Sequence, residues 1–132
     1  MTSPAPALTT PQALPPSFSA DEFRHALGMF ATGVTIVTAR DAAGVRVGLT
    51  ANSFNSVSLA PPLVLWSLSK RAGSMRAFSH GSHYAINILA ADQHDIAVRF
   101  ASKAHDRFAG LAFREGAAGA PVLEGAAAVF EC

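Results

Sequence analysis

Two short segments gather hydrogen-bonding groups in a chain that is otherwise apolar. Residues 48–54 read GLTANSF, with a threonine, an asparagine and a serine and no charge. Residues 67–74 read SLSKRAGS and add a lysine and an arginine, with Arg76 just beyond. Short hydroxyls and amides can bind the edge of a polar ring, while cations and the start of a helix can bind an anion. Each segment alone is compatible with an ordinary polar loop, but together they predict a site for a planar polar ligand with a phosphate tail.

Other kinds of site have less support. The only cysteine is Cys132, and the histidines form no dense ligand motif, so we expect no metal site. His80 and His83 lie close in sequence, but surface or structural roles are the simpler interpretation. There is no GxSxG motif for a serine nucleophile and no Walker or dinucleotide glycine pattern. Asp92 and Asp95 are explained by the first turn of a helix, where acidic residues favour the dipole.

Hydrophobic periodicity places the first polar segment at the end of a strand. Ser19 and Glu22 predict a capping box, followed by a helix with Phe23 and Leu27 on its apolar face and its end at Thr32-Gly33. Residues 34–39 are β-branched and apolar, as in a buried strand. A turn at 41–44 and alternation over 45–51 predict its hairpin partner. GLTANSF therefore begins within a strand and extends beyond it.

The second segment is predicted between a strand and a helix. We expect a connection at 56–62, because Pro61 and Pro62 do not suit a central strand. A strand at 63–69 and a short helix at 73–79, ended near Gly81, follow. The remaining expectations are a strand at 83–90, a helix at 92–101 capped by Asp92 with Phe100 facing inward, a mostly irregular stretch at 102–125, and a last strand near the end. This order predicts a mainly β fold with short helices, as a small barrel or an α+β fold.

Composition narrows the class of protein. The chain has 132 residues, 50% hydrophobic and only 14% charged, against roughly 25% charged in an average soluble domain. We therefore expect part of the surface to be covered in an oligomer. A net charge of +1 gives no footprint for nucleic acid. The proline-rich residues 1–17 predict a disordered tail before a domain at 18–132. The sequence shows no signal peptide, no membrane span and one cysteine, so we expect a cytoplasmic protein.

Several blocks in order resemble one known family. They are FRHALGMFATGVTIVTA, then GLTANSFNSVSLAPPLVLWSLS, then YAINILAADQ, then RFA and DRFAG. The chain from Phe23 to Cys132 resembles the short-chain flavin reductases, the reductase components of two-component flavin monooxygenases. These belong to the flavin reductase-like, FMN-binding split-barrel family.

The resemblance implies a fold, a reaction and partners. The fold is a split β-barrel of the FMN-binding type, in a homodimer with the flavin near the interface. The reaction is reduction of FMN or FAD by NADH or NADPH, and the reduced flavin diffuses to a partner monooxygenase. Hydride chemistry belongs to these cofactors, so the resemblance implies no catalytic side chain.

The resemblance also implies which residues bind the cofactor, in four blocks of the chain. They are Thr32, Gly33 and Val34; Thr50, Ala51, Asn52 and Ser53; Ser67, Leu68, Ser69, Lys70, Arg71 and Ser74; and Phe100, Ala101, Ser102 and Lys103. Many relatives have a hydroxyl residue at the position of Ala72. We therefore expect Ser74, Lys70 and Arg71 to hold more of the phosphate.

Two alternatives and one departure accompany this interpretation. Relatives continue beyond the FEC position with further strands and a Gly-Asp-His segment near the nicotinamide, which this chain lacks. We therefore expect the C-terminal strands of the barrel to be missing, a final strand without a partner, and weak reductase turnover. The alternatives are a flavin-binding carrier without turnover and a related pyridoxine phosphate oxidase, which the blocks match less well.

Overall fold

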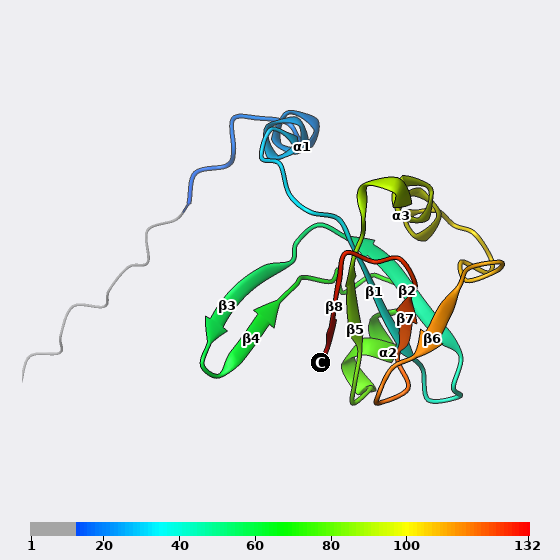
Figure 1. Ribbon diagram of the computed structural model, residues 1–132. Coiled ribbons are helices and arrows are strands. Elements are labelled where there is room, and N and C mark those ends of the chain that lie inside the picture. The colour runs from blue at the N-terminus through cyan, green and yellow to red at the C-terminus, as the bar shows by residue number, and fades with distance from the viewer. Residues whose placement is uncertain (1–12) are drawn as a thin grey trace, which may run out of the picture. The chain divides into compact units, whose positions relative to one another are not determined.

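The computed structural model describes residues 13–132, so residues 1–12 of the predicted tail lie outside the described part. Residues 13–19 contain neither helix nor strand. The chain divides into two compact units, with the boundary between Ala31 and Thr32. Figure 1 gives the labels of the elements.

The described part of the N-terminal unit contains one helix, α1 (Ala20–Gly28). The predicted capping box is present: Glu22 N donates to Ser19 Oγ (3.1 Å) and Ser19 N donates to Glu22 Oε2 (2.7 Å). The helix ends at Gly28 and not at the predicted Thr32-Gly33. Glycine is a poor helix former, and Met29 N already bonds Ala26 O in a tightened last turn.

The C-terminal unit is built on an antiparallel sheet with the strand order β2-β1-β5-β8. Its strands are β1 (Thr35–Arg40), β2 (Arg46–Ala51), β5 (Ala85–Ile88) and β8 (Ala128–Glu131). The predicted hairpin of β1 and β2 is confirmed. Asp41 Oδ1 accepts hydrogen bonds from Ala43 N and Val45 N, each at 2.9 Å, and Gly44 supplies the positive φ of +79° that the turn needs. The last strand has a partner, contrary to the prediction, because β8 pairs with β5.

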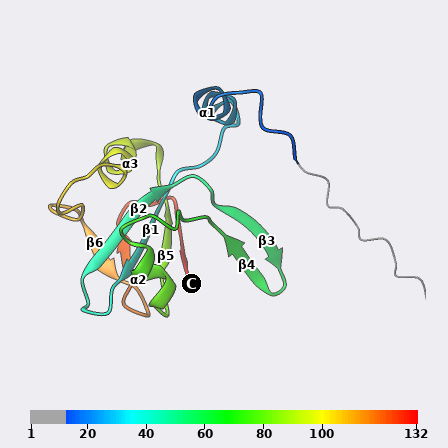
Figure 2. The same ribbon diagram turned by 180° about the vertical axis from the view of Figure 1, so that it is seen from behind.

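Two further strand pairs lie outside this sheet. β3 (Asn55–Leu59) pairs with β4 (Pro62–Leu65), and β6 (Phe113–Glu115) pairs with β7 (Pro121–Leu123). The predicted connection at 56–62 is therefore mostly strand, and the stretch at 102–125 contains two strands. The prediction at Pro62 was wrong because Pro62 is the first residue of a strand in a two-stranded ribbon, where a missing N–H is tolerated. This ribbon extends away from the four-stranded sheet in both views (Figures 1 and 2).

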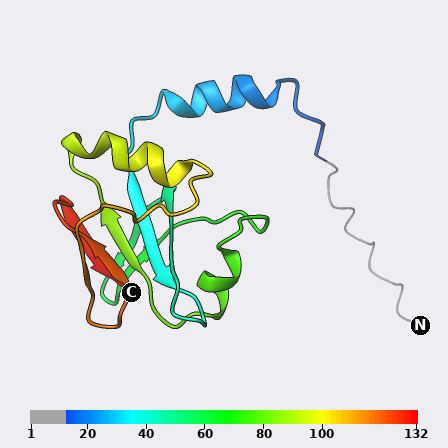
Figure 3. The same ribbon diagram turned by 90° about the vertical axis from the view of Figure 1, so that its right-hand side faces the viewer.

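The short helices lie beside different parts of the sheet (Figure 3). They are α2 (Met75–His80), the 3₁₀ turn η1 (Ala91–Gln93) and α3 (His94–Ala101). Gly81 caps α2 as predicted, whereas Asp92 does not cap α3. Gln93 organises this turn instead: Ala90 N donates to its Oε1 and its Nε2 donates to Glu124 O, each at 2.9 Å.

The core covers both faces of β1. Ile36 packs with Phe100, Phe108 and Leu123, while Val37 packs with Ala51 and Ile86. Neighbouring residues of a strand point to opposite faces, so the run of buried residues in β1 follows from cover on both sides. Among residues 13–132, no helix has the length and apolar character to cross a bilayer.

Candidate functional site

The glycine of GLTANSF is required by packing. Gly48 lies in β2 beneath α3, and a Cβ at this position would lie 2.7 Å from Phe100 Cε1 and 3.3 Å from Phe108 Cζ. These two rings are themselves in edge contact, with centroids 5.0 Å apart. Neither ring is free to move, because both are buried. Gly48 therefore lets β2 approach α3 closely.

The next two residues face different surroundings. The Thr50 hydroxyl donates to Ala97 O of α3 at 2.6 Å, so it ties β2 to that helix. Ala51 is only 8% exposed and lies in the apolar cluster of Val37 and Ile86. Its carbonyl accepts the Thr35 hydroxyl at 2.7 Å. The Ala51 side chain thus belongs to the core, and its role beside a ligand stays a prediction.

The two polar segments identified in the sequence meet at Ser53 and Ser67. Ser67 N donates to Ser53 Oγ at 2.9 Å, and Ser53 Oγ donates to Ser67 O at 3.3 Å. Ser53 follows β2 and Ser67 follows β4, so the whole β3–β4 ribbon lies between them in the sequence. Their contact joins the two polar segments where the ribbon begins and ends. Asn52 beside it is exposed.

The second segment forms a turn that leads to α2. Ala72 N donates to Ser69 O at 2.9 Å, and Arg71 N donates to Ser69 Oγ at 3.2 Å. Lys70 and Arg71 are exposed. Ser74 is the N-cap residue of α2, yet its side chain makes no capping hydrogen bond. The Ser74 hydroxyl is therefore not used by the helix that it precedes.

One pocket joins three of the four predicted blocks. This pocket, here called the ring pocket, has a volume of about 500 Å³ and lies between β2, α3 and the turn before α2. It is lined by Leu49, Thr50, Ala72, Gly73, Ser74, Phe100, Ala101 and Arg107. Thr50, Ser74, Phe100 and Ala101 were predicted from the sequence, and a pocket of this size suits a small-molecule ligand.

The other predicted residues lie outside the lining of the ring pocket in the described chain. They are Thr32, Gly33, Val34, Ala51, Asn52, Ser53, Ser67, Leu68, Ser69, Lys70, Arg71, Ser102 and Lys103. Val34 supports the sheet, because its carbonyl accepts Leu89 N at 3.0 Å. The Ser102 hydroxyl donates to Arg99 O at 2.7 Å at the end of α3.

Sequence reasoning missed Arg107. Its guanidinium donates from Nη1 to Gly48 O at 2.7 Å and from Nη2 to Ser102 O at 2.6 Å. Arg107 therefore joins β2 to the segment after α3 and forms part of the ring pocket wall. It stands in the quoted DRFAG block, but a single arginine in a predicted loop has no spacing that marks it as a site residue.

The walls of the ring pocket suit binding and orientation of a ligand. They offer hydroxyls, backbone groups, one aromatic ring and one arginine, with no carboxylate or histidine among the lining residues. Such a site has little means for general acid–base catalysis by side chains. It fits chemistry that bound cofactors carry out.

A family model described as the flavin reductase like domain matches residues 27–132. This chain belongs to that family. Among relatives, it is 48% identical over 110 residues to "FMN reductase (NADH) SmoA" of Agrobacterium fabrum, covering 83% of this chain and 62% of the relative. It is 45% identical over 111 residues to the reductase component of "Flavin-dependent trigonelline monooxygenase" of Acinetobacter baylyi, covering 84% of this chain and 36% of the relative.

A solved flavin reductase of the same fold is the NADH:FAD oxidoreductase SgcE6 of Streptomyces globisporus, in complex with NAD and FAD fragments. The match has a TM-score of 0.79 and 39% sequence identity, and it covers 85% of this chain and 67% of that one. The resemblance to flavin reductases and the mainly β fold are thereby confirmed. The chain thus spans 62% of the length of the first of these relatives and 36% of the length of the second.

Proposed function

We propose that this protein binds FMN or FAD, reduces it with NADH or NADPH, and supplies the reduced flavin to a flavin-dependent monooxygenase. The observation that carries this proposal is the ring pocket, where Thr50, Ser74, Phe100 and Ala101 meet. Relatives named as an NADH-dependent FMN reductase and as the reductase component of a monooxygenase support the reaction and the partner.

The residues of the site have distinct roles in this proposal. Thr50 and the backbone around Ala51, Asn52 and Ser53 lie along the flavin ring, with Phe100 and Ala101 at its far wall. Ser74 binds the phosphate, and the exposed cations Lys70 and Arg71 add charge. When both cofactors are bound, the nicotinamide supplies a hydride to the flavin, and the protein aligns the two rings and excludes water.

We further propose that residues 18–132 belong to a split barrel of the FMN-binding type that works as a cytoplasmic homodimer. Apolar side chains on the β3–β4 ribbon support a covered surface, since Leu59 is 95% exposed and Val57, Leu63 and Leu65 are about half exposed. Such a cluster on one arm is typical of an interface. A lone cysteine supports a reducing compartment.

The test is NADH and NADPH oxidation with and without added FMN or FAD. A flavin reductase oxidises the nicotinamide nucleotide only when flavin is present. A carrier binds flavin without oxidising the nucleotide, so binding without turnover would leave the carrier as the function. Absence of both binding and turnover would reject the proposal.

A further inference from the structure

Arg107 holds two walls of the ring pocket with one side chain. Its Nη1 donates to Gly48 O at 2.7 Å, and its Nη2 donates to Ser102 O at 2.6 Å. Gly48 directly precedes Leu49, which lines the pocket from β2. Ser102 directly follows Ala101, which lines it from the end of α3. Each anchor of Arg107 is therefore next to a residue of the pocket wall.

The two carbonyls lie where regular secondary structure supplies few donors. β2 is at one edge of the four-stranded sheet, and an edge strand has one row of backbone groups without a strand partner. Ser102 is the C-cap residue of α3, and carbonyls at the end of a helix lack intrahelical donors and favour a cation. One guanidinium donates at both places, so it joins the strand to the end of the helix.

The guanidinium of Arg107 is oriented by the backbone and not by an ion pair. Arg107 is half-buried, and its side chain has no carboxylate partner among residues 13–132. The fork of an arginine is planar and rigid, so donation from both terminal nitrogens fixes the separation of the two carbonyls. A lysine carries the same charge on a single nitrogen at the end of a flexible stem. It would not fix this separation in the same way.

A second contact joins the same strand and helix. The Thr50 hydroxyl donates to Ala97 O within α3 at 2.6 Å, whereas Arg107 acts at Ser102, where the helix ends. The lining residues Phe100 and Ala101 lie between these two points of attachment. The wall formed by α3 is therefore held against β2 on both sides of the residues that face the pocket.

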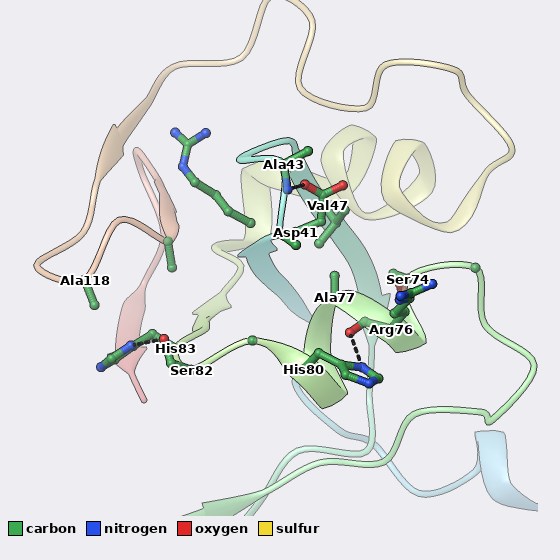
Figure 4. A pocket seen from close by; sticks show the side chains of 15 residues that line it. Asp41, Ala43, Val47, Ser74, Arg76, Ala77, His80, Ser82, His83 and Ala118 are labelled. Carbon is green, nitrogen blue, oxygen red and sulfur yellow. Dashed lines mark hydrogen bonds between the residues drawn. The ribbon is translucent and has the colours of Figure 1, made fainter.

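The position of Arg107 limits the region that it can affect directly. It lines the ring pocket and a neighbouring pocket of about 480 Å³. A larger pocket, of about 750 Å³, lies beside α2 and includes Asp41 and Arg76 (Figure 4). This larger pocket meets the other two at Gly73 and Ser74, but Arg107 is not among its lining residues. The direct effect of Arg107 is on the walls formed by β2 and α3.

We propose that Arg107 is a positioning residue that sets the width of the ring pocket and thereby aligns a planar ring between β2 and α3. It acts through the carbonyls of Gly48 and Ser102 and not by binding a phosphate. This inference rests on the proposed function, since it takes the isoalloxazine of a flavin as the ring. Riboflavin and FMN carry the same ring and only FMN carries a phosphate, so loss of Arg107 should weaken both by the same factor.

The test compares Arg107→Met with Arg99→Met. Arg99 Nη1 also donates from α3 to a backbone carbonyl, Ala109 O, at 2.6 Å, but Arg99 lies outside the lining of the three pockets in the described chain. Arg107→Met should raise the dissociation constants of riboflavin and FMN roughly tenfold each, since misplacement by about 1 Å in a positioned site can cost up to a hundredfold. Arg99→Met should leave both constants unchanged.

Flavin fluorescence gives the dissociation constants, and visible circular dichroism of the bound flavin reports the alignment of its ring. Arg107→Lys keeps the charge without the fork, so it should weaken both ligands in the same ratio, by a smaller factor, and it tests the inference if the methionine variant does not fold. Unchanged constants, a loss confined to FMN, or full affinity in Arg107→Lys would overturn the inference. An equal loss in Arg99→Met would also overturn it, because the effect would then belong to α3 as a whole.

Hydrogen exchange without flavin separates this inference from the proposed function. In Arg107→Met, the amides of residues 49–50 and 100–103 should exchange faster than in the unsubstituted chain, because the two walls are no longer joined at this point. Unchanged exchange at these amides would overturn the inference. If the unsubstituted chain binds neither flavin, the proposed function fails, while the exchange rates still decide whether Arg107 fixes the walls.

Discussion

Ser74 lines the ring pocket, and Gly48 lies in β2, the strand beside that pocket. The two positions are constrained in different ways. Ser74 carries a hydroxyl that makes no capping bond to its own helix, so its side chain is available to a ligand. Gly48 carries no side chain because two buried rings occupy the space that a Cβ needs. At the residue scale, one position is therefore expected to affect binding, and the other to affect stability.

Ser74→Ala should weaken FMN binding more than riboflavin binding, because riboflavin lacks the phosphate. A hydrogen bond to a charged group contributes roughly 1.5–3 kcal/mol. Fluorescence titration with both ligands measures the difference, and Ser79→Ala, at the exposed end of α2, is the control. Equal losses for both ligands would place the phosphate elsewhere, with Phe100 to Lys103 as the next candidate.

Gly48→Ala should lower the free energy of unfolding. The added methyl would meet Phe100 at 2.7 Å, and overpacking of a core typically costs about 1–3 kcal/mol. Denaturant unfolding measures the change. Gly33→Ala is the control, because no described atom lies within 4 Å of a Cβ there. Similar midpoints for the two variants would show that β2 and α3 adjust without strain.

At the scale of elements, the start of α1 is held by a reciprocal pair of hydrogen bonds. The backbone amide of Ser19, and then its hydroxyl, lowers the pKa of Glu22 from its ordinary value of 4.5. A carboxyl whose pKa is lower in the folded state stabilises that state at higher pH, where it is ionised. Its contribution is complete above about pH 4.5 and is lost as the pH falls through the lowered pKa.

The helicity of α1 should therefore decrease on acidification below pH 4.5. Backbone chemical shifts of residues 20–28, followed by NMR in the whole chain, measure this change. Glu22→Gln keeps the side-chain hydrogen bond but removes the ionisable group, so its α1 shifts should lose this titration. A titration in Glu22→Gln as large as in the unsubstituted chain would assign the effect to another group.

At the scale of the whole molecule, the β3–β4 ribbon exposes several apolar side chains to solvent. Its exposed Leu59, Leu63 and Leu65 are costly in water at roughly 25 cal/mol per Å² of apolar surface. The exposed apolar surface and the low charged fraction of the chain favour an assembly that covers the ribbon.

The protein should be a homodimer at micromolar concentration. Leu63→Asp places a charge on the ribbon and should shift the mass measured by light scattering toward the monomer. Val98→Asp, on α3 and with a similar exposed fraction (57% against 48% for Leu63), should leave the dimer intact. A monomer mass for the unsubstituted chain would count against the dimer and against a flavin site near its interface.

The sequence alone predicted the features that depend on local interactions. The capping box of Ser19 and Glu22, the turn at Asp41 and Gly44, and the buried strand β1 were all identified correctly. Each depends on residues only a few positions apart, or on an apolar run that must be covered on both faces. The family was also identified from ordered blocks of residues, and the match over residues 27–132 confirms it.

Only the tertiary structure decided which distant residues share a pocket. The β3–β4 ribbon escaped prediction because Pro62 is acceptable at the start of a strand, a fact that depends on its neighbours in space. Arg107 became part of the ring pocket wall through carbonyls of Gly48 and Ser102, which lie 59 and 5 positions away. The Ala51 side chain lies in the core because its position in β2 places it in the cluster of Val37 and Ile86. Such contacts arise when β2, α3 and the turn at Ser74 pack together, and no local pattern in the sequence encodes that packing.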